Sequence, residues 1–551
     1  MEGSSSDAGG APAGMRWWGW GHEDRRVALS ARLAQLLDES LGLDGSMREP
    51  VALSQVALPK ATLTPRARQR LAAVVGREWV NTDDTSRILH SGGKSYLDLV
   101  AMRTGTPRGA PDAIVYPDSH EAVLAVLSVC ANERVAVVPF GGGTSVVGGL
   151  APIAGSQHAV ISLDLSRLTG VFSVDRRSQT VSVAAGTLAP VLEAALAELE
   201  LTLGHYPDSF EFVSIGGCAA TRSVGQASSG YGSIDEAIHG VRFASPAGEC
   251  SPAALPASAA GPALRELIVG SEGVLGVITG LLLRVRPRPA HRIYEGVLFE
   301  SFDAAADTVR LAVQDEATPD VVRLCDEVAT RLWLAAGEER DRGVPRGRLG
   351  RRARAAVLAI VGWEGQRLSV QRRRLHTMTL LRRGGGVTIG EGVGRAWARS
   401  RFAGPYLRDE LLARGVLVDQ FETATTWTGL APLRAAVTAA LTGALGSLGT
   451  PPLIGCQISH VYETGASLSF TVLARALEHQ ESEQWRAAKD AASAAIVGSG
   501  ATISHHHGIG RDNAPWAASE LGPLGTASLR ALKAQFDPLG VMNPGKLILA
   551  A

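Results

Sequence analysis

The sequence predicts an α+β fold that is divided into at least two packed units. Its 551 residues exceed the length at which a single hydrophobic core stops growing. A helical pattern lies among several short β-rich runs, and this mixture is typical of an α+β module. The helical pattern covers residues 121–132, and the β-rich runs cover residues 113–116, 135–138, 159–163 and 180–183. The composition changes after Pro289 to helices and strands with fewer glycines, so we expect a second unit to begin near residue 291.

The N-terminal part is expected to be mostly helical between residues 15 and 106. Residues 1–14 consist largely of Gly, Ser and Ala with little to bury, and we expect them to be disordered. The tryptophan-rich stretch 17–21 is expected to anchor this part to a core. Apolar residues recur at helical spacing over 27–41 and 64–75, which predicts two short helices.

Composition restricts the class of protein. Lys+Arg and Asp+Glu are equal at 54 each, which argues against bulk nucleic-acid binding. The five cysteines are scattered, odd in number and without a C-x-x-C pair, so they predict reduced thiols and neither a disulfide framework nor a zinc site. The sequence has no signal-like start and no apolar run long enough to span a bilayer. We therefore expect a soluble, cytoplasmic protein whose membrane contact, if any, is peripheral.

Two polar stretches are interpreted as surface features. Residues 87–100 place His90 and Lys94 among glycines before a helical pattern, as at the entry to a surface helix. Residues 340–354 are rich in arginine, with Gly and Pro between, and predict an exposed loop or a contact with lipid head groups.

A glycine-rich turn follows the apolar run 135–138 directly. Gly141, Gly142 and Gly143 can adopt positive φ angles and leave backbone N–H groups bare. Thr144 and Ser145 add hydroxyl donors, so the turn can hold a pyrophosphate without a lysine. The stretch matches neither G-x-G-x-x-G nor G-x-x-x-x-G-K-[ST], and its alternative interpretation is a plain β-turn.

Two further glycine clusters follow in the chain. The stretch 204–218 contains a Pro-Asp-Ser turn and then exposed glycine backbone beside Ser214. The stretch 270–279 brings small residues to a bend that leads into a strand ending near Pro287. Three such clusters in this order favour one extended ligand site over three unrelated turns.

Two polar stretches late in the chain predict an active site. In the stretch 459–465, strand alternation places His460 and Tyr462 on one face. Three consecutive histidines at 505–507 invite a metal, but in an extended segment the middle ring points away from its neighbours, so one tetrahedral zinc is the weaker hypothesis. The flanks 501–503 and 508–510 predict a buried strand running into a tight turn, which favours an active site over exposed histidines.

These motifs resemble those of the vanillyl-alcohol-oxidase-type flavoproteins and, within them, most closely the alkyldihydroxyacetonephosphate synthase family. The Tyr-Glu-Thr-Gly and Ser-His-His-His-Gly runs and the tail 536–546 carry the resemblance to that branch, which extends from about residue 17 to 546. The resemblance implies a two-lobed FAD-binding domain at 107–290, a mixed α+β cap domain at 291–500, and a C-terminal segment at 501–551. That last segment is expected to complete the active site and pack on the FAD-binding domain.

The resemblance implies non-covalent FAD as the cofactor and no metal. The family pattern has Glu before its Pro-Asp-Ser turn, where this chain has Tyr206. The implied FAD contacts are Pro139, Phe140, Gly141, Gly142, Gly143, Thr144, Ser145, Pro207, Asp208, Ser209, Ser214, Gly216, Gly217, Thr221, Arg222, Glu272, Gly273, Gly276, Val277 and Ile278.

The resemblance also implies the reaction. The acyl group of an acyl-dihydroxyacetone phosphate is exchanged for a long-chain alcohol through a flavin N5 adduct, which belongs to ether-lipid synthesis. Arg323 and Arg408 would grip the phosphate, and nearby arginines would stabilise a Tyr462 phenolate that acts as a base. The implied catalytic residues are Tyr462, His505, His506 and His507. The implied partners are the lipid-like phosphate and the alcohol, with peripheral membrane contact and a homodimer as further expectations.

Two alternatives stay open at this point. One is an FAD-dependent oxidase or dehydrogenase of a 2-hydroxy acid such as D-lactate or glycolate, although such relatives carry a His-x-x-Gly-Asp-Gly-Asn-x-His run where this chain reads His460-Val-Tyr-Glu-Thr-Gly-Ala. The other is a flavin-binding protein without catalysis. That alternative leaves the tyrosine, histidines and arginines without a role.

Overall fold

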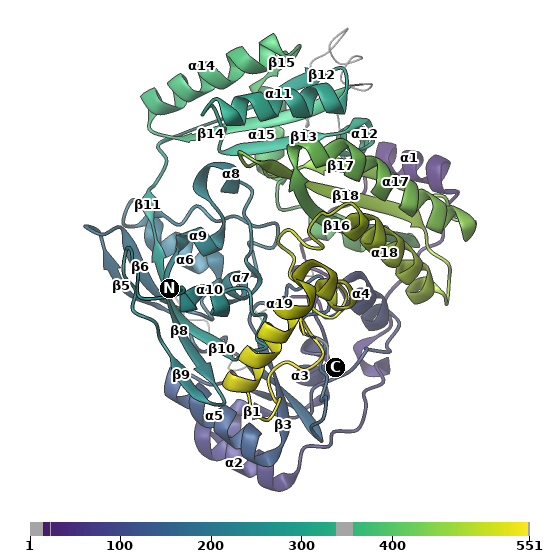
Figure 1. The fold of residues 1–551 in the computed structure, drawn as a ribbon. Helices are drawn as coiled ribbons and strands as arrows, with labels where there is room; N and C mark the ends of the chain where they lie inside the picture. Colours follow the sequence, from purple (N-terminus) through teal and green to yellow (C-terminus); the bar gives the residue numbers. More distant parts are fainter. Residues whose placement is uncertain (1–14, 23, 338–355, 549–551) are drawn as a thin grey trace, which may run out of the picture.

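The structure is a computed structural model that describes residues 15–22, 24–337 and 356–548. The expected disorder of residues 1–14 and the arginine-rich stretch 340–354 lie outside the described residues. Two bodies of secondary structure are stacked in Figure 1, a blue and teal half below and a green half above. We call them the FAD half and the cap half.

The FAD half contains two main sheets. A four-stranded sheet has the order β1-β2-β4-β3, in which β2, β4 and β3 are parallel and β1 is antiparallel to β2. A five-stranded antiparallel sheet has the order β5-β6-β10-β8-β9, and β11 pairs with β7. The strands are β1 (Val80–Asn81), β2 (Ala113–Val115), β3 (Val135–Phe140), β4 (Ala159–Asp164), β5 (Val171–Asp175), β6 (Thr180–Ala184), β7 (Leu201–Thr202), β8 (Ile238–Ser245), β9 (Gly248–Cys250), β10 (Val277–Arg284) and β11 (Arg286–Pro287). The four predicted β-rich runs are therefore confirmed as β2, β3, β4 and β6.

Helices cover these two sheets. The predicted helix at 121–132 is confirmed as α5 (His120–Glu133), whose apolar side packs on the four-stranded sheet. The other helices of this half are α6 (Ala189–Ala197), α7 (Ile215–Thr221), α8 (Ser228–Tyr231), α9 (Ile234–Ala237) and α10 (Leu264–Ile268).

The cap half is built on one seven-stranded antiparallel sheet. Its order is β15-β12-β14-β13-β17-β18-β16, and its first strand in the chain begins at His291. The strands are β12 (His291–Phe299), β13 (Val321–Cys325), β14 (Val357–Gly365), β15 (Val387–Gly390), β16 (Val416–Thr426), β17 (Leu453–Ile458) and β18 (Gly465–Arg475). The helices are α11 (Phe302–Gln314), α12 (Glu327–Ala335), α14 (Arg367–Arg383), α15 (Glu391–Ser400), α16 (Gly404–Ala413), η3 (Trp427–Gly429), α17 (Leu430–Ser447) and α18 (Glu481–Gly498).

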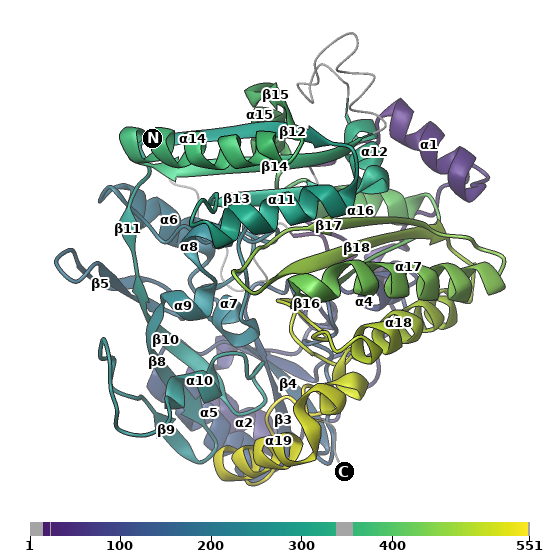
Figure 2. The same cartoon turned by 45° about the horizontal axis from the view of Figure 1, so that its top comes forward.

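Strand alternation gives this sheet two buried faces. Val297 belongs to the core that includes α11, α14, α17 and α18, whereas its neighbour Leu298 belongs to a separate core with Trp397 of α15. Figure 2 shows the first set of helices lying across the sheet. The opposite face also contacts Ala227 of the FAD half, so the sheet is covered on both sides.

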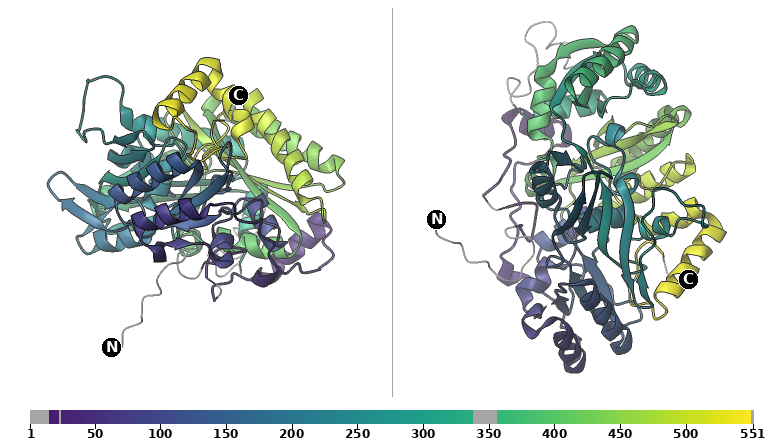
Figure 3. Two further views of the ribbon diagram at one scale, coloured as in Figure 1. Left: turned by 90° about the horizontal axis from the view of Figure 1, so that it is seen from below. Right: turned by 90° about the vertical axis from the view of Figure 1, so that its left-hand side faces the viewer.

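The N-terminal segment packs on both halves, and the C-terminal segment packs mainly on the FAD half. The N-terminal segment contains α1 (Ala31–Leu41), η1 (Leu53–Gln55), α2 (Pro65–Val75), η2 (Arg77–Trp79), α3 (Asp84–Leu89) and α4 (Tyr96–Arg103). Helix α1 contacts α12 and β18 of the cap half, and α2 contacts α5 of the FAD half. Figure 3 shows the purple N-terminal segment running along both halves. Trp20 is buried against Phe212 and Tyr406, which confirms the predicted anchor.

At the other end, the long helix α19 (Ala514–Phe536) lies along the FAD half in Figure 1. Phe536 packs edge-on against Phe243, and Met542 bridges to Val137 of β3.

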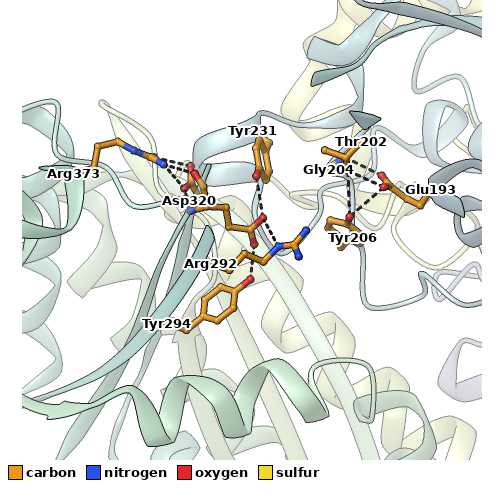
Figure 4. Close-up of polar contacts among 10 residues, drawn as sticks. Glu193, Thr202, Gly204, Tyr206, Tyr231, Arg292, Tyr294, Asp320 and Arg373 are labelled. Atoms are coloured by element: carbon orange, nitrogen blue, oxygen red, sulfur yellow. Dashed lines mark hydrogen bonds and ion pairs between the residues drawn. The ribbon is translucent and has the colours of Figure 1, made fainter. Parts of the chain in front are cut away.

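A buried ionic cluster joins the two halves (Figure 4). Glu364 of β14 accepts hydrogen bonds from Tyr294 of β12 at 2.5 Å and from Tyr231 of the FAD half at 3.0 Å. Asp320 accepts a bidentate pair from Arg373, with both distances 2.9 Å. Both carboxylates are almost fully buried and hydrogen-bonded, and the bond from Tyr231 to Glu364 links the cluster to the FAD half.

No helix in the described part of the chain is long and apolar enough to cross a lipid bilayer.

Candidate active site

A cavity of about 570 Å³ lies between the two halves. The FAD half contributes its glycine-rich turns, and the cap half contributes arginines and apolar side chains. Of the expected FAD contacts, all but Arg222 line this cavity, as do Arg323, Arg408, His506 and His507. Tyr462 and His505 lie behind His506 and do not form part of the cavity wall.

The glycine-rich turn at the end of β3 has no room for side chains. A Cβ on Gly142 would lie 1.7 Å from the carbonyl oxygen of Phe212, and one on Gly141 would lie 2.1 Å from Oγ of Ser214. Gly143 has a φ of +71°, which favours glycine. These three glycines let the turn pack closely on residues 212–214 while its other side faces the cavity.

The other two glycine clusters support this turn. Ser214 caps α7 by accepting the N–H of Gly217 at 3.2 Å, and Gly216 packs on Ala185, where a Cβ would come within 2.7 Å of the alanine Cβ. Gly273 has a φ of +73° and lies against the Pro139 ring. Gly216 and Gly273 therefore allow the backbone to pack closely against neighbouring residues of the protein, and their close contacts are not with a ligand.

Glu272 has a structural partner in the C-terminal segment. Its two carboxylate oxygens accept the N–H groups of Ile509 and Gly510, each at 2.7 Å. Burial raises the pKa of Glu272 to about 7, against the effect of these two donors. The Glu272 carboxylate therefore holds the loop that follows the three histidines against the FAD half.

The structure does not bring Arg222 to the cavity. Residue 222 ends α7 with a φ of +51°, and its guanidinium contacts Asp235 and Glu266 on the outer side. The expectation that Arg222 binds phosphate is therefore corrected. The glycines near Arg222 in the sequence shape the backbone, but they do not direct the Arg222 side chain into the cavity.

Arg323 and Arg408 both reach the cavity. Arg323, from β13, lies 3.5 Å from Asp208, and Arg408, from α16, donates to the carbonyl of Lys94 at 2.8 Å. The Nε–H of each arginine is buried and has no hydrogen-bond partner among the described residues. Buried unpaired donors are costly, so both side chains are arranged to receive an anion.

The predicted strands around the tyrosine and the histidines are wrong in detail. Tyr462 lies in the turn between β17 and β18, where its N–H donates to Gly465, and residues 501–510 form an irregular loop. The turn points Tyr462 toward the loop, and a hydrogen-bonded chain results. Tyr462 Oη lies 2.6 Å from Nε2 of His505, whose Nδ1 lies 2.8 Å from Nδ1 of His506.

Glu422 of β16 ends this chain. Its Oε2 lies 2.8 Å from Nδ1 of His506 and 3.7 Å from Nε2 of His507. Burial alone would raise the pKa of Glu422, but its interaction with the positively charged His506 outweighs burial and holds that pKa well below its usual range. Burial lowers the pKa of His506, and Glu422 reverses the effect and raises it. His506 is therefore the imidazolium partner of a buried carboxylate.

The neighbouring groups carry no charge. Burial and the charge of His506 lower the pKa of His505 to about 3, and burial also lowers the pKa of His507. Partial burial of the phenol and the acidic residues Glu236 and Asp235 raise the pKa of Tyr462 above its usual range, although the residue as a whole is 41% exposed. The expected stabilisation of a Tyr462 phenolate by arginines is corrected, because acidic groups face this phenol. The Nδ1–H of His506 faces both Glu422 Oε2 and His505 Nδ1. When His505 Nδ1 accepts that proton in a hydrogen bond, the Nε2–H of neutral His505 is left to donate to Tyr462.

The three consecutive histidines do not converge on one point in the structure. His505 and His506 lie with His460, and His506 and His507 lie with Glu422, with nitrogen or oxygen atoms of each group within 4.8 Å of one another. Within the described residues, no such group contains all three. Hydrogen bonds and the ion pair with Glu422 account for both arrangements.

Sequence reasoning missed several residues of the site. Glu422 belongs to no recognisable motif, because a single acidic residue in a strand pattern looks like any solvent-facing position. Lys94 was interpreted as a surface residue, yet it is buried, donates to the carbonyl of Arg16 and supplies the carbonyl that Arg408 binds. His90 is also buried, 2.9 Å from Asp164. The glycines before Lys94 were the available signal, since Gly93 packs tightly on Ser145.

Part of the cavity wall is apolar. Leucines of four different elements contribute to it, and they offer an apolar surface to a hydrocarbon chain in the same cavity as the two arginines. These residues are Leu33, Leu332, Leu407, Leu411 and Leu473.

The residues of the FAD half fit a dinucleotide cofactor. The cavity wall holds bare glycine backbone over three turns, and Oδ1 of Asn543 is a buried acceptor without a partner among the described residues. Asn543 is fixed by its amide group, which donates to the carbonyls of Gly149 and Glu272. Backbone N–H groups and fixed polar side chains of this kind suit a pyrophosphate and a polar ring edge.

Comparisons with known proteins agree with this architecture. A family model described as "FAD binding domain" matches residues 111–251, and one described as "FAD linked oxidases, C-terminal domain" matches residues 288–547. They confirm the predicted α+β fold and FAD as the cofactor.

Named relatives extend the match to most of the chain. An alkyldihydroxyacetonephosphate synthase of Dictyostelium discoideum is 32% identical over 88% of this chain and 81% of its own length. One of Trypanosoma brucei brucei is 30% identical over 89% of this chain and 82% of its own length. A solved alkyldihydroxyacetonephosphate synthase structure superposes with a TM-score of 0.83 at 27% identity, over 96% of this chain and 98% of that one. The chain belongs to the alkyldihydroxyacetonephosphate synthase family of FAD-dependent enzymes.

Proposed function

We propose that this enzyme exchanges the acyl group of an acyl-dihydroxyacetone phosphate for a long-chain alcohol, a step of ether-lipid synthesis. One observation carries the proposal. A single cavity joins a cofactor cradle, two arginines with unpaired N–H groups and an apolar part of the wall lined by leucines. A substrate with a phosphate at one end and a hydrocarbon chain at the other matches that combination.

Arg323 and Arg408 bind the phosphate in this proposal. Their free Nε–H groups supply charge-assisted hydrogen bonds, which are about twice as strong as those between neutral groups. Asp208 on Arg323 and the Lys94 carbonyl on Arg408 hold the two side chains in place. The phosphate then fixes the reacting carbon with respect to the cofactor turn and the histidines.

Proton transfer is assigned to the chain from Tyr462 to Glu422. FAD, when bound, supplies the nucleophilic ring nitrogen and the electron sink of the exchange. His506 and His507 face the cavity, and Tyr462 reaches it through His505. The imidazolium of His506 donates a proton to a leaving oxygen, and neutral His507 accepts one from the substrate carbon.

An oxidase of a 2-hydroxy acid is the weaker proposal. A substrate of two or three carbons leaves the leucine-lined part of the cavity wall without a function. Mass spectrometry of products formed from acyl-dihydroxyacetone phosphate and hexadecanol tests the choice. We expect the alkyl product, with no bleaching of the flavin on addition of D-lactate. Flavin bleaching by D-lactate without alkyl product would favour the oxidase.

Two features of the assembly remain proposals. Peripheral contact with a membrane would bring a lipid substrate to the cavity, and sedimentation with lipid vesicles tests it. A homodimer is the proposed oligomeric state, and light scattering tests it.

A further inference from the structure

A second, smaller cavity lies behind the histidines. Its volume is about 20 Å³, and it is enclosed by β16, α18 and the loop that follows residue 503. His507 lines both this cavity and the large one, so its ring forms part of the wall between them. Asp419 also lines both.

Five residues around the small cavity have a buried polar atom without a hydrogen-bond partner among the described residues. The atoms are Oγ of Ser493, Oγ of Ser504, Oδ2 of Asp512, Oδ1 of Asn513 and Oε2 of Glu422, which has only its ion pairs with the histidines. Ser493 and Asn513 are only 1% and 2% exposed. Each buried group left without a hydrogen bond costs on the order of 1–3 kcal/mol, so five in one place call for a common partner.

A water molecule meets the requirement. A cavity needs roughly 10–15 Å³ of this kind of volume to hold one water, and the water needs two to four polar partners. The small cavity exceeds that volume and offers acceptors from both serines, the aspartate and the asparagine amide oxygen. It is too small for a substrate group.

We propose that this cavity binds an ordered water and that the water passes protons between His507 and Asp512. The role of the relay rests on the proposed function, whereas the presence of the water does not. His507 takes a proton from the reacting carbon in the large cavity and gives one to the water, which protonates the Asp512 carboxylate. The reverse transfer delivers the proton to the leaving group, so no net proton is consumed.

The charges around both ends suit this exchange. Asp512 faces Arg108 at 3.5 Å, together with Asp98, Lys489 and Asp419, and burial raises its pKa to about 6. His507 faces Glu422, His506, Asp419 and Asp208, and burial lowers its pKa. The pKa of the carboxyl group is raised and that of the imidazole is lowered, so the two shifts bring their proton affinities closer together.

The water is tested by a crystal structure of the FAD-bound enzyme at a resolution that shows ordered solvent. We expect one solvent peak within hydrogen-bonding distance of Ser493 Oγ and Asp512 Oδ2. An empty cavity overturns the site. Anomalous signal from thallium soaked into the crystal would show a monovalent cation there and would likewise overturn the water.

The relay is tested by Asp512→Asn, with Asp490→Asn as the matched control on the exposed side of α18. We expect Asp512→Asn to slow the exchange by about tenfold or more and to abolish the limb of the pH–rate profile near pH 6, with FAD absorbance and thermal midpoint unchanged. An unchanged profile in an active enzyme overturns the relay. A parent enzyme that forms no alkyl product contradicts the proposed function instead, and the solvent peak still decides the water site.

Discussion

At the scale of single residues, the buried pair of His506 and Glu422 determines where protons reside in the site. Glu422 keeps His506 charged, and burial together with that charge keeps His505 neutral. A neutral His505 can donate Nε2–H to Tyr462 at 2.6 Å, and its Nδ1 lies 2.8 Å from His506, which faces the cavity. Tyr462 is thus connected to the cavity by way of the two histidines.

Tyr462→Phe removes the phenol oxygen and keeps the ring. If the phenol transfers a proton in the transition state, the rate of exchange should fall by roughly 10²–10⁴ while FAD stays bound. The measurement is alkyl product formed per unit time. Tyr206→Phe serves as the control, because Tyr206 bonds to Glu193 and Thr202 away from the histidines. Near-normal turnover of Tyr462→Phe would remove the tyrosine from the proton path.

Arg323→Ala and Arg408→Ala each remove a cation from the proposed phosphate site. One charge-assisted hydrogen bond contributes about 1.5–3 kcal/mol, so we expect kcat/KM for the phosphate-bearing substrate to fall roughly ten- to hundredfold. The FAD content should not change. Arg222→Ala is the matched control, since its ion pairs lie outside the cavity. Equal kinetics in all three variants would contradict the assignment.

The pair of Glu422 and His506 should give stability that depends on pH. The depressed pKa of Glu422 contributes stability above its ordinary value of 4.5, and this is lost as pH falls through the folded value. The raised pKa of His506 contributes stability below its ordinary value of 6.5, and this is lost as pH rises through the folded value. Both contributions are complete between those two ordinary values.

Glu422→Gln should therefore lower the thermal midpoint more at pH 5.5 than at pH 9. The control is Glu391→Gln, whose carboxylate makes an exposed ion pair with Arg395. Exposed pairs contribute about 0–1 kcal/mol, so the control should change little at either pH. An equal loss for Glu422→Gln at both pH values would show that the pair is not ionic.

The sequence predicted the residue types of this site better than their geometry. The run of histidines and the two arginines could be found because they form motifs or align with a resembling family. Glu422 and Asp512 could not, because a carboxylate acquires its role only when folding brings it next to a particular imidazole or cavity. The prediction that Arg222 contacts the cofactor was wrong because its position also depends on the fold. Its backbone has a positive φ, and its side chain points away from the cavity.

At the scale of elements, the turn after β3 shows why glycine is required. Gly142→Ala places a methyl group 1.7 Å from a carbonyl oxygen, so the turn or residues 212–214 must move. We expect FAD content per protein to fall strongly. Gly443→Ala is the control, because nothing lies within 4 Å of that position in α17 and alanine favours the helix by roughly 0.5–1 kcal/mol. Full FAD content in Gly142→Ala would contradict the cradle.

Regular elements could be predicted and irregular ones could not. Helix α5 and strands β2, β3, β4 and β6 have clear periodicity, and each was found at nearly its observed bounds. The stretch 459–465 was predicted as a strand from its alternation, and the flanks 501–503 and 508–510 were predicted as a buried strand that runs into a tight turn. Their backbone instead forms a turn and a loop that are held by distant partners such as Glu272, which no local pattern reports.

At the scale of the whole molecule, the FAD should be held without a covalent bond. The turn that faces the cavity at 139–145 contains no His, Cys or Tyr to which a flavin ring can attach. The purified protein should be yellow, and acid precipitation should release FAD into the supernatant, as measured by its absorbance. Colour that stays with the precipitate would contradict this prediction.

The packing of the C-terminal segment on the FAD half has a consequence for synthesis. Strand β3 pairs with Met542 near the C-terminus, and the histidine loop is fastened to Glu272. The residues of the C-terminal segment that complete the FAD half therefore leave the ribosome only after the entire cap half has emerged. During translation the FAD half cannot complete its core until the C-terminal segment emerges. Part of its apolar core is exposed until then, so we expect slow folding of the nascent chain and binding by chaperones.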